Sequence, residues 1–262
     1  ESKVHTLNGA FGLAEFNRAI EKKKNSAPGK DRIPYSVYQN LPLVAREYVL
    51  HFINLIWESN QIPPQLKHAI MVPVLKQNGN ASEASSYRPI ALSPCLIKIM
   101  ETMIKTRLDW FLEKHEILPT FMSGFRRGRS ITDNIVNLEN DVQKSINNKE
   151  HTLAVFLDIN KAYDTVWIEG LIHKLGNIGI QGNMLRFLHN FLKDRTYQVR
   201  VGRQLSHEFK MERGLPQGSI LSPTLFNIML NDIPTDPSIK ISLYADDCAI
   251  WISRSNIPFI TK

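Results

Sequence analysis

Three aspartates offer the clearest chemistry in this sequence: Asp158, Asp246 and Asp247. Asp246 and Asp247 are neighbours, so their carboxylates repel each other unless a cation holds them, and a divalent metal ion with oxygen ligands is the simplest candidate. By itself the pair is better explained as a solvated turn. The metal interpretation therefore depends on whether the fold brings Asp158 to the same place.

Such a set of carboxylates is suited to phosphoryl transfer. Two metal ions about 3.5 to 4 Å apart can activate an attacking hydroxyl and stabilise the leaving oxygen of an in-line displacement. Magnesium or manganese suits oxygen ligands, whereas zinc prefers histidine or cysteine. The eight histidines are scattered without metal-ligand spacing. A metal-dependent nuclease would use the same carboxylates with water as the nucleophile, and it is one of the alternatives left open.

Two elements are expected to position these aspartates. Apolar β-forming residues at 241–243 and 248–252 flank the Tyr-Ala-Asp-Asp sequence at 244–247, which predicts a strand, a tight turn and a returning strand. The continuous apolar run at 153–157 predicts a strand buried on both faces that ends at Asp158. The pattern thus predicts that strand ends bring distant carboxylates together.

The rest of the chain predicts a single α+β unit whose first part is mainly helical. A core helix is expected over residues 42–59, with its buried face formed by Val44, Tyr48, Phe52 and Leu55. A strongly amphipathic helix is indicated by Ile97, Met100, Ile104, Leu108 and Phe111. A buried strand is expected over residues 69–75 and a hairpin over 197–211.

The densest basic segment covers residues 123–130 and contains Arg126, Arg127 and Arg129 together with two glycines. Glycine lets a backbone approach a ligand closely, and the arginine guanidinium forks onto phosphate oxygens. Ser130 and Asp133 have the spacing of a capping box, which predicts that a helix starts there. We interpret the segment as a phosphate-binding loop at a helix entry.

Composition indicates a nucleic-acid partner. The 262 residues carry a formal net charge of +7, and 43% of them are hydrophobic, enough for a substantial core. The two cysteines, Cys95 and Cys248, are far apart and are predicted to be reduced, buried thiols of an intracellular protein. The apolar runs are too short for a membrane span.

Three segments occur in the order of successive polymerase motifs: residues 156–164 around Asp158, the Gly-Leu-Pro-Gln-Gly loop at 214–218, and the Tyr-Ala-Asp-Asp turn. Together they resemble the motifs of reverse transcriptases. Residues 123–130 and the Tyr-Arg-Pro-Ile sequence at 87–90 resemble the fingers motifs of non-LTR, LINE-type retrotransposon enzymes, with the jockey group the most similar. Residues 27–29 resemble a motif upstream of those fingers.

The resemblance implies roles for named residues. Asp158 and Asp246 would be the main metal ligands and Asp247 a supporting one, with two Mg²⁺ (or Mn²⁺) ions as cofactors. Five residues would bind the incoming deoxynucleotide, namely Tyr163 under the sugar, Gln217 and Gly218 near the nucleotide, and Lys76 and Arg88 on the triphosphate. The three loop arginines would hold template or nucleotide phosphates.

The resemblance also implies a right-hand polymerase fold, with helical fingers and an antiparallel palm sheet packed on helices. Residues 1–150 would form the fingers and the upstream motif region, and 151–262 the palm, with about 170–212 returning toward the fingers. We expect a fingers-palm piece that ends before the thumb. Its partners would be an RNA template, a DNA primer and deoxynucleotides, at a nuclear site of action in a eukaryotic host. The sequence does not specify an oligomeric state.

A non-catalytic RNA- or DNA-binding remnant of a mobile element is the main alternative to an enzyme. The absence of a thumb favours the remnant. The intact set of Asp158, Tyr163, Gln217, Asp246 and Asp247 favours the enzyme, because random decay tends to remove such residues.

Overall fold

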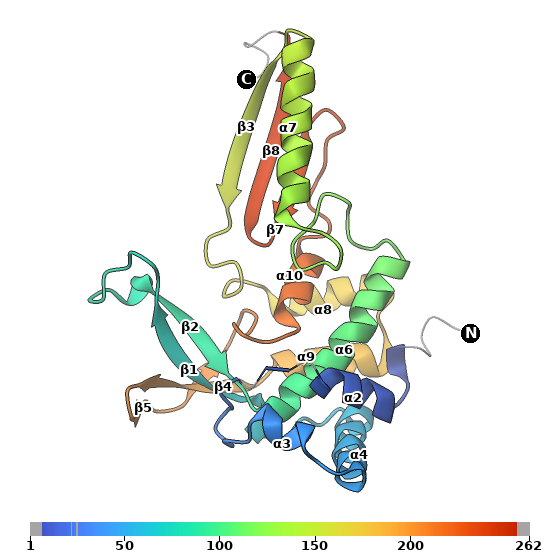
Figure 1. Cartoon of the computed structure of the whole chain (residues 1–262), viewed down its shortest axis with the longest axis vertical. Coiled ribbons are helices and arrows are strands. Elements are labelled where there is room, and N and C mark those ends of the chain that lie inside the picture. The colour runs from blue at the N-terminus through green and yellow to red at the C-terminus, as the bar shows by residue number, and fades with distance from the viewer. Residues whose placement is uncertain (1–6, 22, 25, 256–262) are drawn as a thin grey trace. The chain divides into compact units, whose positions relative to one another are not determined.

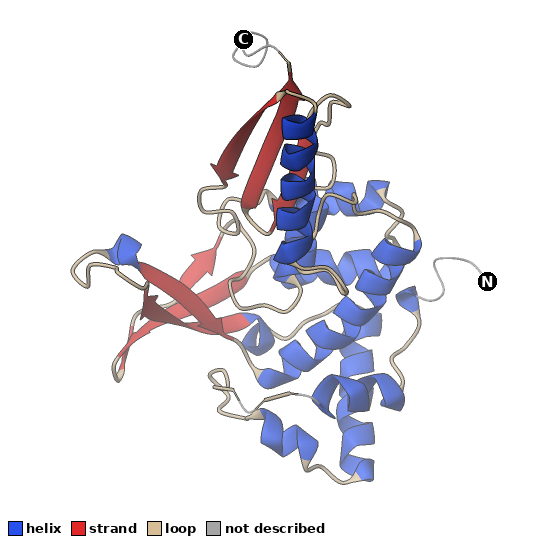
Figure 2. Cartoon of the chain, turned by 45° about the horizontal axis from the view of Figure 1, so that its top comes forward, coloured by secondary structure: helices blue, strands red, loops and turns tan. Residues whose placement is uncertain are grey.

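The computed structural model describes residues 7–21, 23–24 and 26–255, and it has the α+β composition that was expected (Figures 1 and 2). The chain forms two compact units. Unit 1 contains residues 1–111 and 163–222, and unit 2 contains residues 112–162 and 223–262. Residues 112–150, expected with the fingers, belong to unit 2, whereas residues 163–222, which include the segment of about 170–212 expected to return toward the fingers, pack with the first 111 residues. Each unit is described separately below.

Most helices belong to unit 1. They are α2 (Leu13–Glu21), α3 (Tyr35–Gln39), α4 (Leu43–Ser59), α5 (Pro64–Lys67), most of α6 (Cys95–Lys114), α8 (Ile168–Asn177) and α9 (Gly182–Leu192). The amphipathic pattern of α6 is confirmed, since all five of its predicted apolar positions are buried. Trp57, Phe187 and Phe191 are among the largest fully buried side chains of this unit.

The sheet of unit 1 is centred on β1 (His68–Leu75). It pairs antiparallel with β2 (Tyr87–Leu92) and parallel with β4 (Arg195–Val201). Strand β4 in turn pairs antiparallel with β5 (Gln204–Leu205) and β6 (Phe209–Met211). A short 3₁₀ turn, η1 (Ala84–Ser86), precedes β2. Both the predicted strand at 69–75 and the predicted hairpin at 197–211 are confirmed as elements. The expected burial of the strand is wrong at its end, where Val74 and Leu75 are exposed.

The predicted buried face of α4 is wrong. Val44, Tyr48, Phe52 and Leu55 are exposed, and Tyr48 retains 73% of its accessible surface. The buried face is formed instead by Leu50, Ile53, Ile56 and Trp57. The helix carries apolar residues at helical spacing on two sides, so periodicity alone does not determine which side faces the core.

Unit 2 contains a three-stranded antiparallel sheet with the order β3 (His151–Asp158), β8 (Asp247–Arg254), β7 (Lys240–Tyr244). Helix α7 (Ile131–Asn147) lies along this sheet (Figure 1) and is tied to it by a hydrogen bond from Trp251 Nε1 to Asp141 Oδ2 at 3.1 Å. The predicted capping box starts α7, with the Ser130 amide donating to Asp133 Oδ2 at 2.7 Å. Helix α10 spans Ser222–Met229.

Strand β3 exists, but the prediction that both of its faces are buried is wrong. Leu153, Val155 and Leu157 are exposed, and Phe156 retains 72% of its accessible surface. The reason is topological, because β3 is an edge strand that pairs only with β8 within the described chain. A continuous apolar run is therefore not sufficient evidence for burial on two sides.

The predicted cysteine chemistry is confirmed in part, since Cys95 and Cys248 are both free and buried. In the described part of the chain, no helix combines the length and the apolar character needed to span a membrane.

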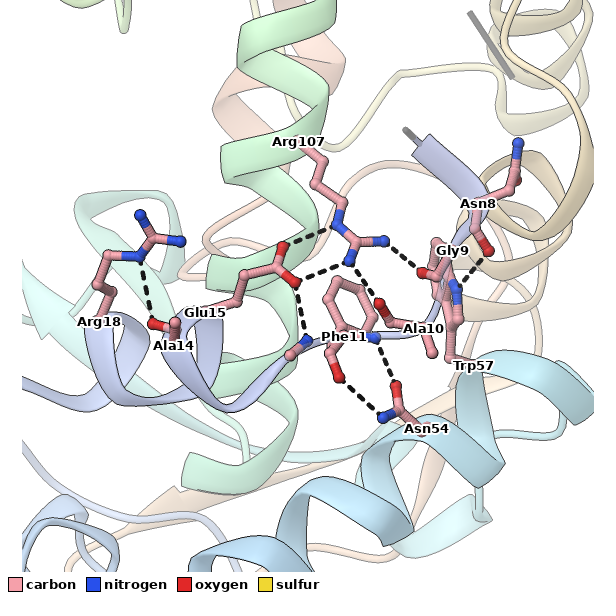
Figure 3. A network of polar contacts seen from close by, with 11 residues as sticks. Asn8, Gly9, Ala10, Phe11, Ala14, Glu15, Arg18, Asn54, Trp57 and Arg107 are labelled. Carbon is pink, nitrogen blue, oxygen red and sulfur yellow. Dashed lines mark hydrogen bonds and ion pairs between the residues drawn. The ribbon is translucent and has the colours of Figure 1, made fainter. Parts of the chain in front are cut away.

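Arg107 of α6 anchors the segment that precedes α2 in unit 1 (Figure 3). Its guanidinium forms two 2.8 Å hydrogen bonds with the Glu15 carboxylate, donates to the carbonyls of Gly9 and Ala10, and lies 4.0 Å from the centre of the Phe11 ring. Burial raises the pKa of Glu15, but Arg107 and the Gly12 amide outweigh it, so that this pKa lies below its ordinary value.

We expect Arg107→Ala to lower the free energy of unfolding by about 2–4 kcal/mol, because it leaves a partly buried carboxylate and two carbonyls without their donor. The Glu15 contribution is present above its ordinary pKa of 4.5 and is lost as the pH falls toward the lower folded-state value, so the difference between wild type and variant should shrink in acid. Urea denaturation at several pH values measures this. The matched control is Arg203→Ala, because Arg203 is exposed and has no polar contact with other described residues, and an equal loss there would contradict the assignment.

Candidate active site

The predicted hairpin around Asp246 is confirmed. Tyr244, the last residue of β7, pairs with Asp247, the first residue of β8, so that Ala245 and Asp246 form a two-residue turn. Ala245 has φ of 58°, in the left-handed region that usually requires glycine, asparagine or aspartate. This conformation costs an ordinary residue about 1–2 kcal/mol, so the surrounding contacts must hold the turn in place.

Strand β3 brings Asp158 to this hairpin within unit 2. Asp158 lies directly opposite Asp247 at the last pair of the β3–β8 ladder, and the next amide, that of Ile159, donates to the Asp246 carbonyl at 3.3 Å. Like charges on opposite strands destabilise a sheet. None of the three aspartates has a lysine or arginine partner among the described residues, so their repulsion is not relieved by the chain itself.

The three carboxylates fit a divalent metal ion by charge and by ligand type, since all their donor atoms are oxygens and Asp158 and Asp247 are exposed. They do not form a complete cage: the described residues contain no group of three or more acidic, histidine or cysteine side chains gathered as a metal site. Magnesium sites that act on nucleotides commonly use one or two carboxylates and take further oxygens from substrate phosphates and water. The three aspartates therefore supply oxygen ligands on two strand ends and do not by themselves form a metal site in the described part of the chain.

Residues 121–124 support the turn from the side of β7. The Leu243 amide donates to the Phe121 carbonyl and the Ser123 amide donates to the Leu243 carbonyl, both at 2.9 Å. Gly124 then passes so close to the turn that a Cβ at this position would overlap the Ala245 amide nitrogen and lie 3.2 Å from the Tyr244 carbonyl carbon. Asn227 Nδ2 donates to the Gly124 carbonyl at 2.8 Å. The glycine expected to approach a ligand thus approaches the turn at Ala245 and Asp246.

The loop arginines divide into different roles. Arg126 does not fit the predicted phosphate contact, because its side chain is only 5% exposed and forms a two-point ion pair with Glu113 at 2.7 and 2.8 Å. It also donates to the carbonyls of Pro119 and Met122. Arg127 is exposed and has no polar contact with other described residues, and Arg129 is half-buried and donates to the Thr120 carbonyl. Arg126 therefore shapes the loop, and Arg127 is available to a ligand.

The predicted triphosphate residues come together on one hairpin of unit 1. Arg88 of β2 pairs with Val74 of β1, and two residues further along, the Lys76 amide donates to the Ser86 carbonyl at 2.8 Å. Because side chains alternate along strands, Lys76 and Arg88 lie on the same face as diagonal neighbours. Both are exposed, and Lys76 Nζ donates to the Ser85 carbonyl. Residues 77–86, which separate Lys76 from β2 in the chain, form the loop at the end of the hairpin.

The Gln217 loop lies against the same β2 strand. The Ala91 amide donates to the Gln217 carbonyl at 3.1 Å, and Gly218 has φ of 96° with its Cβ position 3.0 Å from the Ala91 carbonyl oxygen. The positive φ and the close approach to the Ala91 carbonyl both favour glycine at position 218. At the other end of the loop, the Leu215 amide donates to the Tyr163 carbonyl at 2.7 Å. Unit 1 therefore contains all five predicted nucleotide-binding residues, and the Gln217 loop contacts β2 at Ala91, three residues after Arg88.

Asp164 has a role that the sequence did not reveal. Its Oδ1 accepts a 2.9 Å hydrogen bond from Gln217 Nε2, which fixes the direction of the Gln217 amide. The acidic residue next to Tyr163 was recognised as part of a motif, but nothing in its local sequence indicates a partner fifty-three positions away.

Comparison with known proteins gives a family. The model described as reverse transcriptase (RNA-dependent DNA polymerase) matches residues 74–257. Over 93% of the chain, 32% of residues are identical to a probable RNA-directed DNA polymerase from transposon BS of Drosophila melanogaster, and over 95% of the chain 30% are identical to the RNA-directed DNA polymerase from mobile element jockey of the same organism.

The chain spans 27% and 28% of the lengths of these two relatives. Among solved structures, a chain of a partial Cas6-RT-Cas1–Cas2 complex is similar to this one, with a TM-score of 0.49 and 17% sequence identity. The aligned region covers 96% of this chain and 38% of the chain in that complex, and the similarity is too distant to carry an argument.

Proposed function

We propose, since the chain belongs to the reverse transcriptase family in its non-LTR, LINE-type branch, that it copies RNA into DNA for a mobile element. In this reaction a primer 3′-hydroxyl attacks the α-phosphate of a deoxynucleoside triphosphate. A phosphodiester bond forms, the bond to the β-phosphate breaks, and pyrophosphate leaves. Template RNA, primer DNA and deoxynucleotides are thus the proposed partners.

The observation that carries the proposal is the pairing of Asp158 with Asp247 beside the Asp246 turn. Two divalent ions bound there, magnesium or manganese, would lower the pKa of the attacking hydroxyl and neutralise charge on the leaving pyrophosphate. The three aspartates would present negatively charged oxygens at fixed positions on the ends of two strands. Because a sheet ladder sets their spacing, little rearrangement is needed when a nucleotide binds.

The residues of unit 1 would bind and select the nucleotide. Lys76 and Arg88 present two cations on one exposed face, a suitable arrangement for a triphosphate. Gln217, oriented by Asp164, would contact the nucleotide through its amide. The Tyr163 ring would pack under the sugar, where it would clash with a ribose 2′-hydroxyl and so favour deoxynucleotides. The exposed Arg127 and the net charge of +7 support binding of a nucleic-acid backbone.

Primer extension on an RNA template tests the function and the cofactor together. The protein in its natural full-length form is expected to extend a DNA primer in magnesium, to stop when EDTA removes the metal, and to recover when magnesium is returned. Deoxynucleotides should be strongly preferred over ribonucleotides. RNA binding that weakens with salt, without any nucleotide incorporation, would contradict the proposal and favour the non-catalytic remnant.

A further inference from the structure

Glu101 is the one carboxylate buried among the described residues, with 1% of its surface accessible. It lies on α6 within the apolar stripe, four residues after Ile97 and three before Ile104, both of which are fully buried. A buried carboxylate is costly unless hydrogen bonds and an opposite charge compensate it. Its presence in a helix core therefore calls for a specific set of partners.

Those partners come from the segment that follows Gln217 and Gly218. Glu101 Oε2 accepts hydrogen bonds from the Ile220 amide at 2.7 Å and the Leu221 amide at 3.3 Å, and also from the Ser219 hydroxyl. Three consecutive residues thus donate hydrogen bonds to one carboxylate oxygen. No other described side chain holds this part of the loop so directly, because the remaining polar contacts of residues 219–221 lie within the loop itself.

Arg195, the first residue of β4, supplies the opposite charge. It is 2% exposed, donates to the Phe191 carbonyl at 3.1 Å, and lies 4.6 Å from the centre of the Phe191 ring. Burial raises the pKa of Glu101, and the Ser219 hydroxyl and the positive charge of Arg195 oppose that rise. Helix α6 and the loop therefore meet at Glu101 Oε2, and the Arg195 charge on β4 acts on the carboxylate without a direct ion pair among the described residues, so that Glu101 Oε1 accepts no hydrogen bond.

The remaining contacts of the loop show what the carboxylate controls. The segment before Gln217 is tied to Tyr163 and Val166 by the amides of Leu215 and Gly214, and the Ser222 hydroxyl donates to the Pro216 carbonyl. Gln217 and Gly218 lie between these ties and the residues that Glu101 holds. If Glu101 no longer accepted these bonds, the Ser219 hydroxyl and the Ile220 amide would lose their acceptor and the Leu221 amide would keep only Ser219 Oγ, so the loop would have to move to satisfy them.

We propose that Glu101 is a positioning residue for the nucleotide: its carboxylate fixes residues 219–221 and so sets the position of Gln217 and Gly218 for binding a deoxynucleoside triphosphate. This inference rests on the proposed polymerase function. It differs from a merely structural role because it predicts an effect on nucleotide affinity. Glu101 would act through the loop and would not touch the substrate.

The test compares Glu101→Ala and Glu101→Gln with the control Glu58→Ala, a change at an exposed helical glutamate. For Glu101→Ala we expect a rise of about tenfold or more in the KM for deoxynucleotides, with kcat changed about threefold or less, because ground-state positioning is lost while the carboxylates at 158, 246 and 247 are untouched. Glu101→Gln keeps the volume and an acceptor oxygen, so it should stay within about threefold of wild-type KM.

Amide hydrogen exchange of residues 219–222 provides a readout that needs no activity. Exchange should accelerate in Glu101→Ala and stay near wild type in Glu58→Ala. Wild-type exchange together with wild-type KM in Glu101→Ala would overturn the inference. A wild-type protein that extends no primer would count against the proposed function, while the exchange data would still decide whether Glu101 holds the loop.

If Glu101→Ala does not fold, Ser219→Ala takes its place, because it removes the hydroxyl that donates to Glu101 and accepts from the Leu221 amide, and it leaves the carboxylate itself in place. Faster exchange of residues 219–222 with a KM raised by about threefold or more would support the inference. An unchanged KM with unchanged exchange would overturn it.

Discussion

Replacing Asp246 by asparagine is expected to reduce RNA-templated DNA synthesis by roughly three orders of magnitude, because metal-bound charge stabilisation contributes several kcal/mol and each 1.4 kcal/mol is a factor of ten. Asparagine keeps the shape of the turn but removes the negative charge. We expect the loss in kcat and not in protein yield. Primer extension under single-turnover conditions measures it, and retention of near wild-type synthesis would remove the basis of the proposed function.

The same hairpin allows a second readout. Asp158 and Asp247 are directly opposite like charges, a pairing that destabilises a sheet by roughly 0.2–1 kcal/mol. Asp247→Asn should therefore make the metal-free protein slightly more stable while it lowers activity. The control is Asp236→Asn, since Asp236 is exposed and its carboxylate accepts hydrogen bonds only from Ser238. Lower activity combined with higher stability is the pattern expected of a functional residue, whereas a structural residue loses both.

The hairpin around Asp246 and helix α6 could be predicted because local pattern and tertiary environment agree at both places. The two apolar runs around the Tyr-Ala-Asp-Asp sequence have the period and the length of strands, and the turn between them has no room for another conformation. In α6 one apolar stripe is wide and continuous, so only one face can be buried. These are local signals that a single sequence contains.

Strand β3 and helix α4 were predicted as elements but with the wrong environment. The residues of each determine its secondary structure, whereas burial depends on which other segments cover it. Residues 153–157 are apolar on both faces, yet β3 is an edge strand with exposed Leu153, Val155 and Phe156. Helix α4 has apolar residues on two faces, and the face that contains Ile53 and Trp57 is the one that is buried in unit 1.

The site residues show the same division. Aspartates with a motif around them could be identified, because their spacing along the chain indicates the chemistry. Residues that act by holding others, such as Asp164 on Gln217, depend on long-range contacts that no local pattern encodes. Glu101 did carry one signal, since a glutamate at a core position of an amphipathic helix is unexpected. Arg126 is the reverse case: the basic run indicated phosphate, but Glu113 and nearby carbonyls occupy its guanidinium.

Gly124→Ala is expected to reduce DNA synthesis about a hundredfold, because a displacement of about 1 Å in a catalytic group can have an effect of that size. The added methyl group would overlap the Ala245 amide nitrogen. Neither group can rotate away, because the backbone of residue 124 fixes the position of its Cβ and the amide nitrogen is itself part of the backbone. The turn already holds Ala245 at φ of 58°, so it has little freedom to adapt. The variant should also lose about 1–3 kcal/mol of unfolding free energy through overpacking.

The matched control is Gly128→Ala in the same loop. Gly128 has φ of 73°, so alanine there is strained by about 1–2 kcal/mol, but no atom lies within 4 Å of its Cβ position. The two variants therefore separate backbone strain from displacement of the turn. Denaturation should show comparable losses of stability, whereas only Gly124→Ala should lose most of its primer extension. If both variants kept their activity, contact with Gly124 would not be what holds Asp246 and Asp247 in position, and the hydrogen bonds of Phe121 and Ser123 to Leu243 would have to suffice.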